Sequence, residues 1–150
     1  MYGFRLNVRA TPSGALVDLE LAPANVADRA MVADIAPPPG CAVVGDRNYW
    51  SPKVAAALAA ERGVKLVAPF RTKSKDPDPK RANRISRFRW AIETAFGQLA
   101  GRFHVKWTWA RDLWHLSHRV IRKVLAHTAC AWMNVTMGRK PHDFDGLAAA

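Results

Sequence analysis

The order in which strand-like and helix-like segments follow one another constrains the fold of this chain more than any other feature. Phe4–Val8 and Ala15–Leu21 alternate apolar and polar residues, which is the period of a half-buried strand. The intervening Thr11–Gly14 segment, Thr-Pro-Ser-Gly, has the composition of a turn. The chain is therefore predicted to begin with an antiparallel hairpin.

Helical and strand-like segments then alternate. Asn25 is expected to cap a helix over residues 26–35. The short apolar run Cys41–Gly45 predicts a strand that is buried on both faces. Ser51 is expected to cap a second helix, and Lys65–Phe70 predicts a further strand.

Two long helical patterns complete the chain. One begins at about Arg81, and the other is expected over Leu113–Met137, followed by a frayed tail over residues 139–150. The positions expected to be buried are Ile85, Phe88, Ile92, Phe96, Leu99 and Phe103 near the first, and Leu116, Val120, Val124 and Ala131 on the second. The order of elements predicts an α/β fold with one mixed sheet and helices on both faces.

Length and composition limit the function. With 150 residues, of which 49% are hydrophobic, the chain is expected to form one folded domain rather than a disordered tail. Its 23 Lys and Arg against 12 Asp and Glu favour a polyanionic partner, with DNA or RNA ahead of a membrane. No apolar run has membrane-spanning length and the start does not resemble a signal peptide, so a cytoplasmic location is expected. Cys41 and Cys130 are interpreted as small core residues of a reduced protein.

Two acidic residues stand at positions that suit a metal site. Asp46 follows the central apolar run, so it is expected at the carboxyl end of a strand, where open α/β sheets usually hold their sites. Glu93 lies beside the buried stripe of the long helix, with Arg89 one turn before it and Gly97 one turn after it. Carboxylates are hard ligands that suit Mg²⁺. Each residue also has an ordinary interpretation, Asp46 as a turn residue and Arg89 with Glu93 as a surface ion pair worth a few tenths of a kcal/mol.

Three segments together carry a resemblance. Gly45–Tyr49 (GDRNY), Arg89–Phe103 (RWAIETAFGQLAGRF) and Leu21–Met31 (LAPANVADRAM) resemble the insertion-sequence transposases that have an Asp-Asp-Glu (DDE) catalytic triad on a ribonuclease-H-like fold. The resemblance spans roughly residues 2–137. It implies that Asp46 is the second acid and Glu93 the third, and that Arg89 orients Glu93 or grips a phosphate. It further implies two Mg²⁺ ions, cleavage at transposon ends and strand transfer into target DNA.

The chain departs from this family at several places. Ser86 stands where related families have a tyrosine, and Ala100 stands where they have a basic residue, with Arg102 as the nearest candidate. The family's first strand, which carries the first aspartate, has no counterpart before the hairpin, and Asp18 and Glu20 lie on the wrong strand to replace it. Because that strand is central in the family's sheet, the resemblance implies a truncated domain over residues 1–138, with two unpaired strand edges, weak stability and little activity alone.

The expected partners are DNA and an upstream transposase half or an intact transposase. The residues expected to contact DNA are Lys73, Lys75, Lys80, Arg81, Arg84, Arg87 and Arg102. The main alternative is a non-catalytic DNA-binding remnant that interferes with intact transposase, and a ribonuclease or resolvase on the same scaffold is a third possibility.

Aromatic residues and histidines near the last helix also have two interpretations each. Trp107, Trp109 and Trp114 are expected to pack the last helix onto the sheet, with base stacking as the alternative. His115 and His118 are expected on a solvated or DNA-facing surface rather than at a metal.

Overall fold

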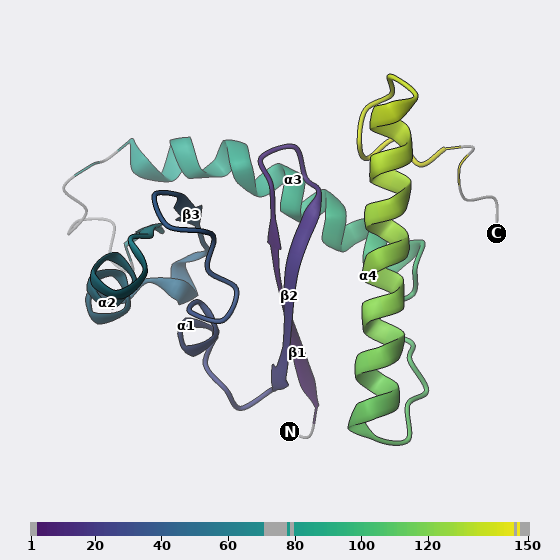
Figure 1. Cartoon of the computed structure of the whole chain (residues 1–150), viewed down its shortest axis with the longest axis horizontal. Helices are drawn as coiled ribbons and strands as arrows, with labels where there is room; N and C mark the ends of the chain where they lie inside the picture. The colour runs from purple at the N-terminus through teal and green to yellow at the C-terminus, as the bar shows by residue number, and fades with distance from the viewer. Residues whose placement is uncertain (1–2, 71–77, 79, 146, 148–150) are drawn as a thin grey trace. The chain divides into compact units, whose positions relative to one another are not determined.

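The computed structural model describes residues 3–70, 78, 80–145 and 147, without the side chains of Ala82, Arg84 and Arg87. Within this part the elements are, in order, β1 (Phe4–Ala10), β2 (Leu16–Pro23), α1 (Asp28–Met31), β3 (Ala42–Val44), the 3₁₀ turn η1 (Arg47–Tyr49), α2 (Pro52–Arg62), β4 (Lys65–Val67), α3 (Arg81–Gly101) and α4 (Leu113–Thr136) (Figure 1). None of the described helices combines the length and hydrophobicity needed to cross a membrane.

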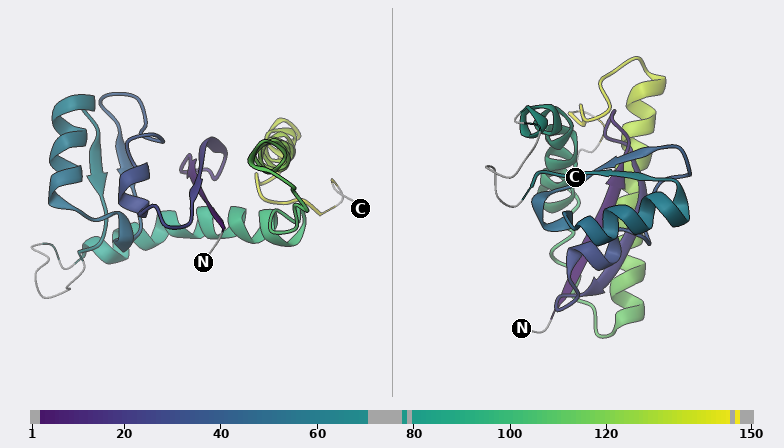
Figure 2. Two further views of the ribbon diagram at one scale, coloured as in Figure 1. Left: turned by 90° about the horizontal axis from the view of Figure 1, so that it is seen from below. Right: turned by 90° about the vertical axis from the view of Figure 1, so that its left-hand side faces the viewer.

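The chain divides into two compact units. The first comprises Met1–Arg9 with Asp18–Arg89, and the second comprises Ala10–Val17 with Trp90–Ala150. The β1–β2 hairpin and the helix α3 each contribute residues to both units, and both can be followed from two further directions in Figure 2. Each unit is described separately below.

The predicted hairpin is confirmed. β1 and β2 are hydrogen-bonded neighbours, and Thr11 N donates to Ala15 O at 2.8 Å across the turn. Gly14 closes the turn at φ 90°, a left-handed conformation that side chains disfavour. A Cβ atom at Gly14 would also lie 1.8 Å from His142 Nε2, so only glycine fits at this position.

The predicted α/β class is confirmed, but the single mixed sheet is not formed. In the described part of the chain, the strands make two separate two-stranded sheets, β1–β2 and β3–β4. The second is parallel, with Val43 opposite Leu66, and α2 forms its crossover. Neither hairpin strand pairs with β3 or β4.

The second sheet is covered on one face. Val32, Leu58 and Leu66 form a buried cluster against which Val43 and Val54 pack. Val44, on the opposite face of β3, is 38% exposed. The prediction of a strand buried on both faces was therefore wrong, because α2 packs against only one side of this short sheet.

Two smaller predictions for the first unit, the burial of Cys41 and the length of the first helix, also differ from the structure. Cys41 is exposed rather than a core residue. The first helix, α1, has four residues, and its N-cap is Ala27, not Asn25. After Met31 the backbone continues in turns, with Asp34 N donating to Met31 O at 3.1 Å, so the expected ten-residue helix is not completed.

The capping of α2 is as predicted. Ser51 Oγ accepts a hydrogen bond from Val54 N at 3.5 Å, and Pro52 occupies the first turn. Gly63 ends the helix at φ 62° and hydrogen-bonds back to Ala59 O. The strand that follows, β4, is shorter than predicted and ends at Val67.

The helix α3 has the predicted start, and Ile85 and Leu99 are buried as expected, but other positions of the predicted stripe are not. Phe88 and Phe96 are 48% and 36% exposed, whereas Ala91 and Ala95 are buried along with the expected Leu99. Small residues at the buried positions allow close packing, and the larger rings are left at the sides. Hydrophobic periodicity alone did not distinguish these two arrangements.

The segment after α4 is packed rather than frayed over residues 139–145. Phe144 is 1% exposed, and its ring lies 6.0 Å from that of Phe103 in an edge-to-face arrangement. Asn134, fully buried in α4, donates through Nδ2 to Pro141 O at 3.2 Å and to Asp143 O at 2.7 Å. These contacts fix the segment in the second unit.

The three tryptophans near the start of α4 are not core residues. Trp107, Trp109 and Trp114 are 65%, 81% and 69% exposed, so they do not pack α4 onto a sheet as predicted. Lys123 instead holds the preceding loop by donating to His104 O at 2.5 Å and to Trp107 O at 3.1 Å.

A buried histidine makes the stability of the second unit depend on pH. His127 is fully buried, and its Nε2 lies 3.0 Å from Gln98 Oε1, which only accepts hydrogen bonds. Burial, and to a lesser extent the charge of His142, lowers the pKa of His127 from 6.5 to about 4. The unfolded chain therefore takes up this proton at a higher pH than the folded chain.

We expect the contribution of His127 to be fully present above about pH 6.5 and to be lost as the pH falls toward 4. The loss should be on the order of 1–3 kcal/mol in the free energy of unfolding. Urea unfolding at pH 7 and at pH 4.5 measures it. A His127→Gln variant, which keeps a side-chain donor toward Gln98, should show a smaller difference between the two pH values. An unchanged difference would assign the pH dependence to other groups.

Candidate active site

The first candidate acid lies just after a strand, as expected. Asp46 stands two residues beyond the end of β3, where Gly45 N donates to Val67 O of β4 at 3.0 Å. Its carboxylate is exposed and caps η1 by accepting from Arg47 N. The turn interpretation of Asp46 is therefore confirmed, whereas its use as a metal ligand stays a prediction.

The other residues of the Gly-Asp-Arg-Asn-Tyr segment hold this turn in place. A Cβ atom at Gly45 would lie 3.2 Å from Tyr49 Cβ and 3.3 Å from its ring, so glycine lets the tyrosine pack against the backbone. The Tyr49 hydroxyl donates to Asn7 Oδ1 on β1 at 2.7 Å. Burial first, and then the negative charges of Asp28 and Asp46, raise the pKa of Tyr49 to about 12, so its hydroxyl stays protonated and can donate.

Asn7 is a residue that sequence reasoning missed. It is 3% exposed, although it is polar and falls in an alternating strand where it was expected to face solvent. Its neighbour Arg5 forms an ion pair with Asp28 at 2.6 Å and donates to Val26 O, which ties β1 to the start of α1. The sequence shows only a polar residue in a predicted strand, and this does not predict a hydrogen bond with a tyrosine 42 positions away.

Replacing Tyr49 by phenylalanine tests this anchor. We expect the free energy of unfolding to fall by about 1–3 kcal/mol, because Asn7 Oδ1 would be left buried without a donor. Chemical denaturation measures the change. In a double-mutant cycle with Asn7→Ala, the two losses should not add, whereas additive losses would show that the hydrogen bond does not couple the two residues.

The second candidate acid lies on α3. Glu93 and Arg89 are both exposed and stand four residues apart on the helix, with Arg89 in the first unit and Glu93 in the second. Apart from its chain neighbours and the backbone of its own helix, no atom of the described residues lies within 4 Å of a Cβ atom built at Gly97, so the position one turn after the glutamate is open. Because Asp46 belongs to the first unit, the joint use of Asp46 and Glu93 as metal ligands is a proposal.

The donor set in the described residues fits a divalent ion only in part. Asp46 and Glu93 are exposed carboxylates, which is the ligand chemistry that Mg²⁺ prefers. Among the described residues, however, no group of three His, Cys, Asp or Glu side chains is arranged to hold a metal ion. The described part of the chain does not by itself form a complete site.

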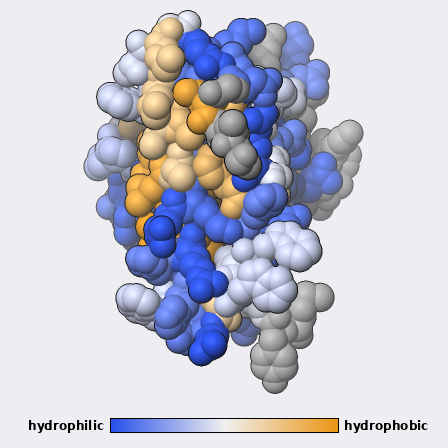
Figure 3. All heavy atoms as spheres, turned by 90° about the vertical axis from the view of Figure 1, so that its right-hand side faces the viewer, coloured by the Kyte–Doolittle hydropathy of each residue, from blue (hydrophilic) through white to orange (hydrophobic). Residues whose placement is uncertain are grey.

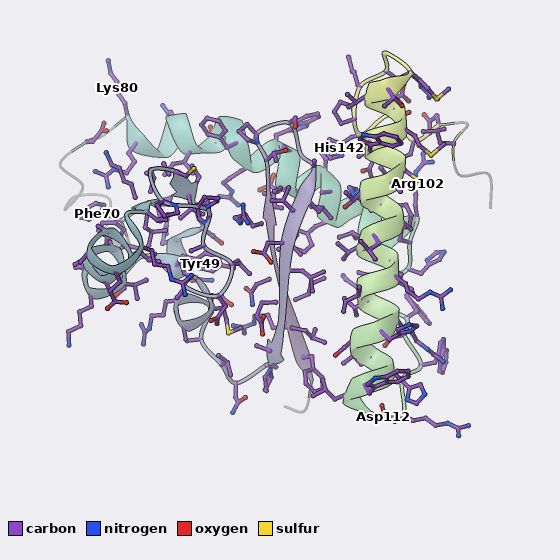
Figure 4. All side chains as sticks on the ribbon, viewed as in Figure 1. Tyr49, Phe70, Lys80, Arg102, Asp112 and His142 are labelled. Carbon is purple, nitrogen blue, oxygen red and sulfur yellow. The ribbon has the colours of Figure 1, made fainter. Side chains whose placement is uncertain are left out.

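The basic residues expected at DNA divide into three groups. Lys73 and Lys75 lie outside the described residues, as do the side chains of Arg84 and Arg87. Lys80 is exposed and projects from the segment just before α3 (Figure 4). Arg81 and Arg102 have structural contacts: the Arg81 guanidinium lies 4.9 Å from the ring centroid of Phe70, and Arg102 donates to Phe144 O at 3.1 Å.

Comparison with known families identifies the class of protein. The family described as Transposase DDE domain matches residues 1–113, three quarters of the chain, and includes Asp46, Arg89 and Glu93. The chain therefore belongs to the transposase DDE domain family. No curated protein sequence and no solved structure gives a significant match.

Proposed function

We propose that this chain supplies the downstream part of a DDE transposase catalytic domain, in which Asp46 and Glu93 are metal-binding carboxylates. Arg89, one helical turn before Glu93, would orient that glutamate or grip a DNA phosphate. The observation that supports the proposal most is the family match over a segment that contains all three residues in the expected order.

The arrangement of the strands supports the idea that a central strand is missing. The described residues form one antiparallel pair and one parallel pair, with no strand joining β1 to β3. The family's sheet has the strand order 3-2-1-4-5, in which the hairpin forms strands 2 and 3 and the parallel pair forms strands 4 and 5. Removal of the central strand 1 would leave two such pairs. The missing strand would also carry the third carboxylate, which accounts for the absence of a three-acid group among the described residues.

In a completed site, two Mg²⁺ ions would activate the attacking hydroxyl and stabilise the leaving oxygen during phosphodiester cleavage. The residues of this chain would hold the ions, orient Glu93 and bind DNA. The net charge of +11 supports DNA as the partner, with Lys80 as an exposed contact, and predicts binding that weakens as salt rises.

The test is to fuse an aspartate-bearing strand ahead of β1 and to measure Mg²⁺-dependent cleavage. The fused protein should cut a duplex that carries the transposon end, whereas the 150-residue chain and a fusion with asparagine in the added strand should not. Preferential cleavage of an RNA–DNA hybrid would favour a ribonuclease instead. An inactive fusion that folds would contradict the catalytic proposal.

The second candidate is a non-catalytic remnant that binds DNA and inhibits intact transposase. The incomplete acid set among the described residues favours this function for the chain alone. Added to an active transposase of the same element, the chain should then slow cleavage without cutting DNA itself. No effect on cleavage at saturating concentrations would argue against this function.

A further inference from the structure

The loop between α3 and α4 exposes two tryptophans. Trp107 and Trp109 are 65% and 81% exposed, although tryptophan side chains are largely buried on average. Their ring centroids lie 6.5 Å apart and their planes meet at 48°, so the rings do not stack on each other and each has a face open to solvent. Figure 3 shows the side of the molecule on which this loop runs past α4, where hydrophilic residues lie beside side chains of intermediate hydropathy. Neither ring is part of the core of the second unit, so their exposure requires a separate explanation.

The backbone of this segment, residues 104–112, here called the tryptophan loop, is held in a conformation that tryptophan disfavours. Trp109 has a φ of 48°, in the left-handed region that residues with bulky side chains rarely adopt. Two cationic side chains of α4 fix the backbone directly before it: Arg119 donates to Thr108 O, and Lys123 donates to Trp107 O at 3.1 Å. Strained backbone of this kind persists only where surrounding contacts impose it, and it is concentrated at active sites and ligand-binding sites. The exposed position of the Trp109 ring is therefore imposed by the fold.

The tryptophan loop also lies in a strongly basic part of the chain. Residues 102–123 contain six Lys and Arg and one acidic residue, Asp112. That aspartate caps α4 by accepting from His115 N at 2.8 Å. Lys106 and Arg111 are exposed on either side of the tryptophans in the sequence, and none of the ion pairs found among the described residues involves either of them. Exposed aromatic rings beside unpaired cations are the combination with which proteins bind single strands, since the cations contact phosphates and the rings stack on bases.

We propose that the tryptophan loop is a binding site for unpaired nucleotides of DNA, in which Trp107 and Trp109 stack on bases and Lys106 and Arg111 contact the adjoining phosphates. Stacked base pairs cover each other's faces in a duplex, so a ring on a protein loop has access only to bases that have left the stack. DNA is the polyanion that suits this chain, because the loop belongs to the segment that matches the Transposase DDE domain family.

The inference rests on DNA being the partner of this chain, as in the proposed function, but it does not depend on the metal site. The tryptophan loop belongs to the second unit, whereas Asp46 belongs to the first. Binding of single strands is measured without Mg²⁺, so a failure of the stacking site would leave the cleavage proposal intact. Conversely, a completed domain that does not cleave DNA would leave the stacking site unaffected.

The first test measures how much of the affinity comes from the bases. Fluorescence anisotropy without Mg²⁺ compares a labelled single strand of about 12 nucleotides with the same strand made abasic at its central positions. The native chain should bind the intact strand about fivefold or more tightly than the abasic one. In a variant with both Trp107→Leu and Trp109→Leu, which keeps apolar side chains without ring faces, this preference should disappear. Equal affinity of the native chain for the two strands would overturn the proposal.

Three control variants separate stacking from other contributions. Trp109→Phe keeps an aromatic face and should retain most of the preference for the intact strand. Leu113→Ala removes a 53% exposed apolar side chain directly after the loop and should leave the preference within about twofold. Lys106→Gln should weaken binding of both strands by a similar factor and reduce its salt dependence, as expected for a phosphate contact. A loss of preference in Leu113→Ala as large as that in the double leucine variant would show a general apolar contact and contradict stacking.

The second test locates the contact and excludes another class of partner. Irradiation of a bound single strand that carries 5-iodouracil should cross-link the base to Trp107 or Trp109, as mass spectrometry of the digested complex would show. Cross-links confined to residues outside the tryptophan loop would contradict the proposal. Exposed tryptophans beside Lys and Arg also suit an anionic membrane surface. Binding to vesicles of phosphatidylcholine and phosphatidylglycerol that is lost in Trp109→Leu, without any preference for intact over abasic DNA, would assign the loop to a membrane instead.

Discussion

Replacing Glu93 by glutamine in a domain completed with its central strand should lower the rate of Mg²⁺-dependent DNA cleavage by more than about 100-fold, since even an outer-shell partner of a metal ligand typically contributes 10–100-fold. Glutamine keeps the size of the side chain but removes the negative charge that a hard divalent ion requires. Glu93 is exposed, so the substitution should leave the free energy of unfolding nearly unchanged.

The matched control is Glu61→Gln, because Glu61 is also an exposed helical glutamate but lies on α2. Its cleavage rate should stay within about twofold of the unchanged protein. Asp46→Asn belongs to the same experiment. Asparagine can still cap η1, so a loss of cleavage in this variant would come from the lost metal ligand rather than from a disrupted turn. Cleavage that survives Glu93→Gln would refute the metal-site proposal while leaving the family membership intact.

Phe144→Ala should destabilise the second unit by about 3–5 kcal/mol, the usual range when a buried phenylalanine is truncated. Phe144 is 1% exposed, and its ring lies 6.0 Å from Phe103 and 5.0 Å from His127. Arg102 donates to its carbonyl oxygen at 3.1 Å, which keeps the backbone of the segment in register. Thermal unfolding and urea denaturation measure the loss.

The control for this substitution is Phe88→Ala, since Phe88 is 48% exposed and should change the unfolding free energy by less than about 1 kcal/mol. If Phe144→Ala does not fold, Phe144→Leu keeps most of the buried volume and should lose less than about 1.5 kcal/mol. A frayed C-terminal tail, as predicted from the sequence, would make both Phe144 variants as stable as the native chain. The two descriptions of residues 139–145 are therefore distinguishable by one measurement.

The sequence was a good guide wherever the decisive interactions are local. The Thr11–Gly14 turn, the Ser51 cap of α2 and the start of α3 depend on residues within four positions of one another, and all three were predicted correctly. The family resemblance, which depends on spacing along the chain, was confirmed by the match over residues 1–113.

The errors share a physical cause, which is that burial depends on partners distant in sequence. The apolar run at Val44 suggested a fully buried strand, but α2 covers only one face of β3. Trp109 suggested a core residue, yet its side chain, in the loop before α4, is 81% exposed. Phe144 suggested part of a frayed tail, but Phe103 and His127 provide a pocket for it.

By itself, the sequence determined the α/β class, the hairpin, the Ser51 cap of α2 and the family, because turn chemistry, hydrophobic period and motif spacing act over short stretches of chain. Only the tertiary structure decided that Asn7 anchors Tyr49, that the described strands form two separate pairs, and that Phe144 is buried. Those outcomes depend on which surfaces find a partner when the chain folds, and local patterns of residues do not encode that choice.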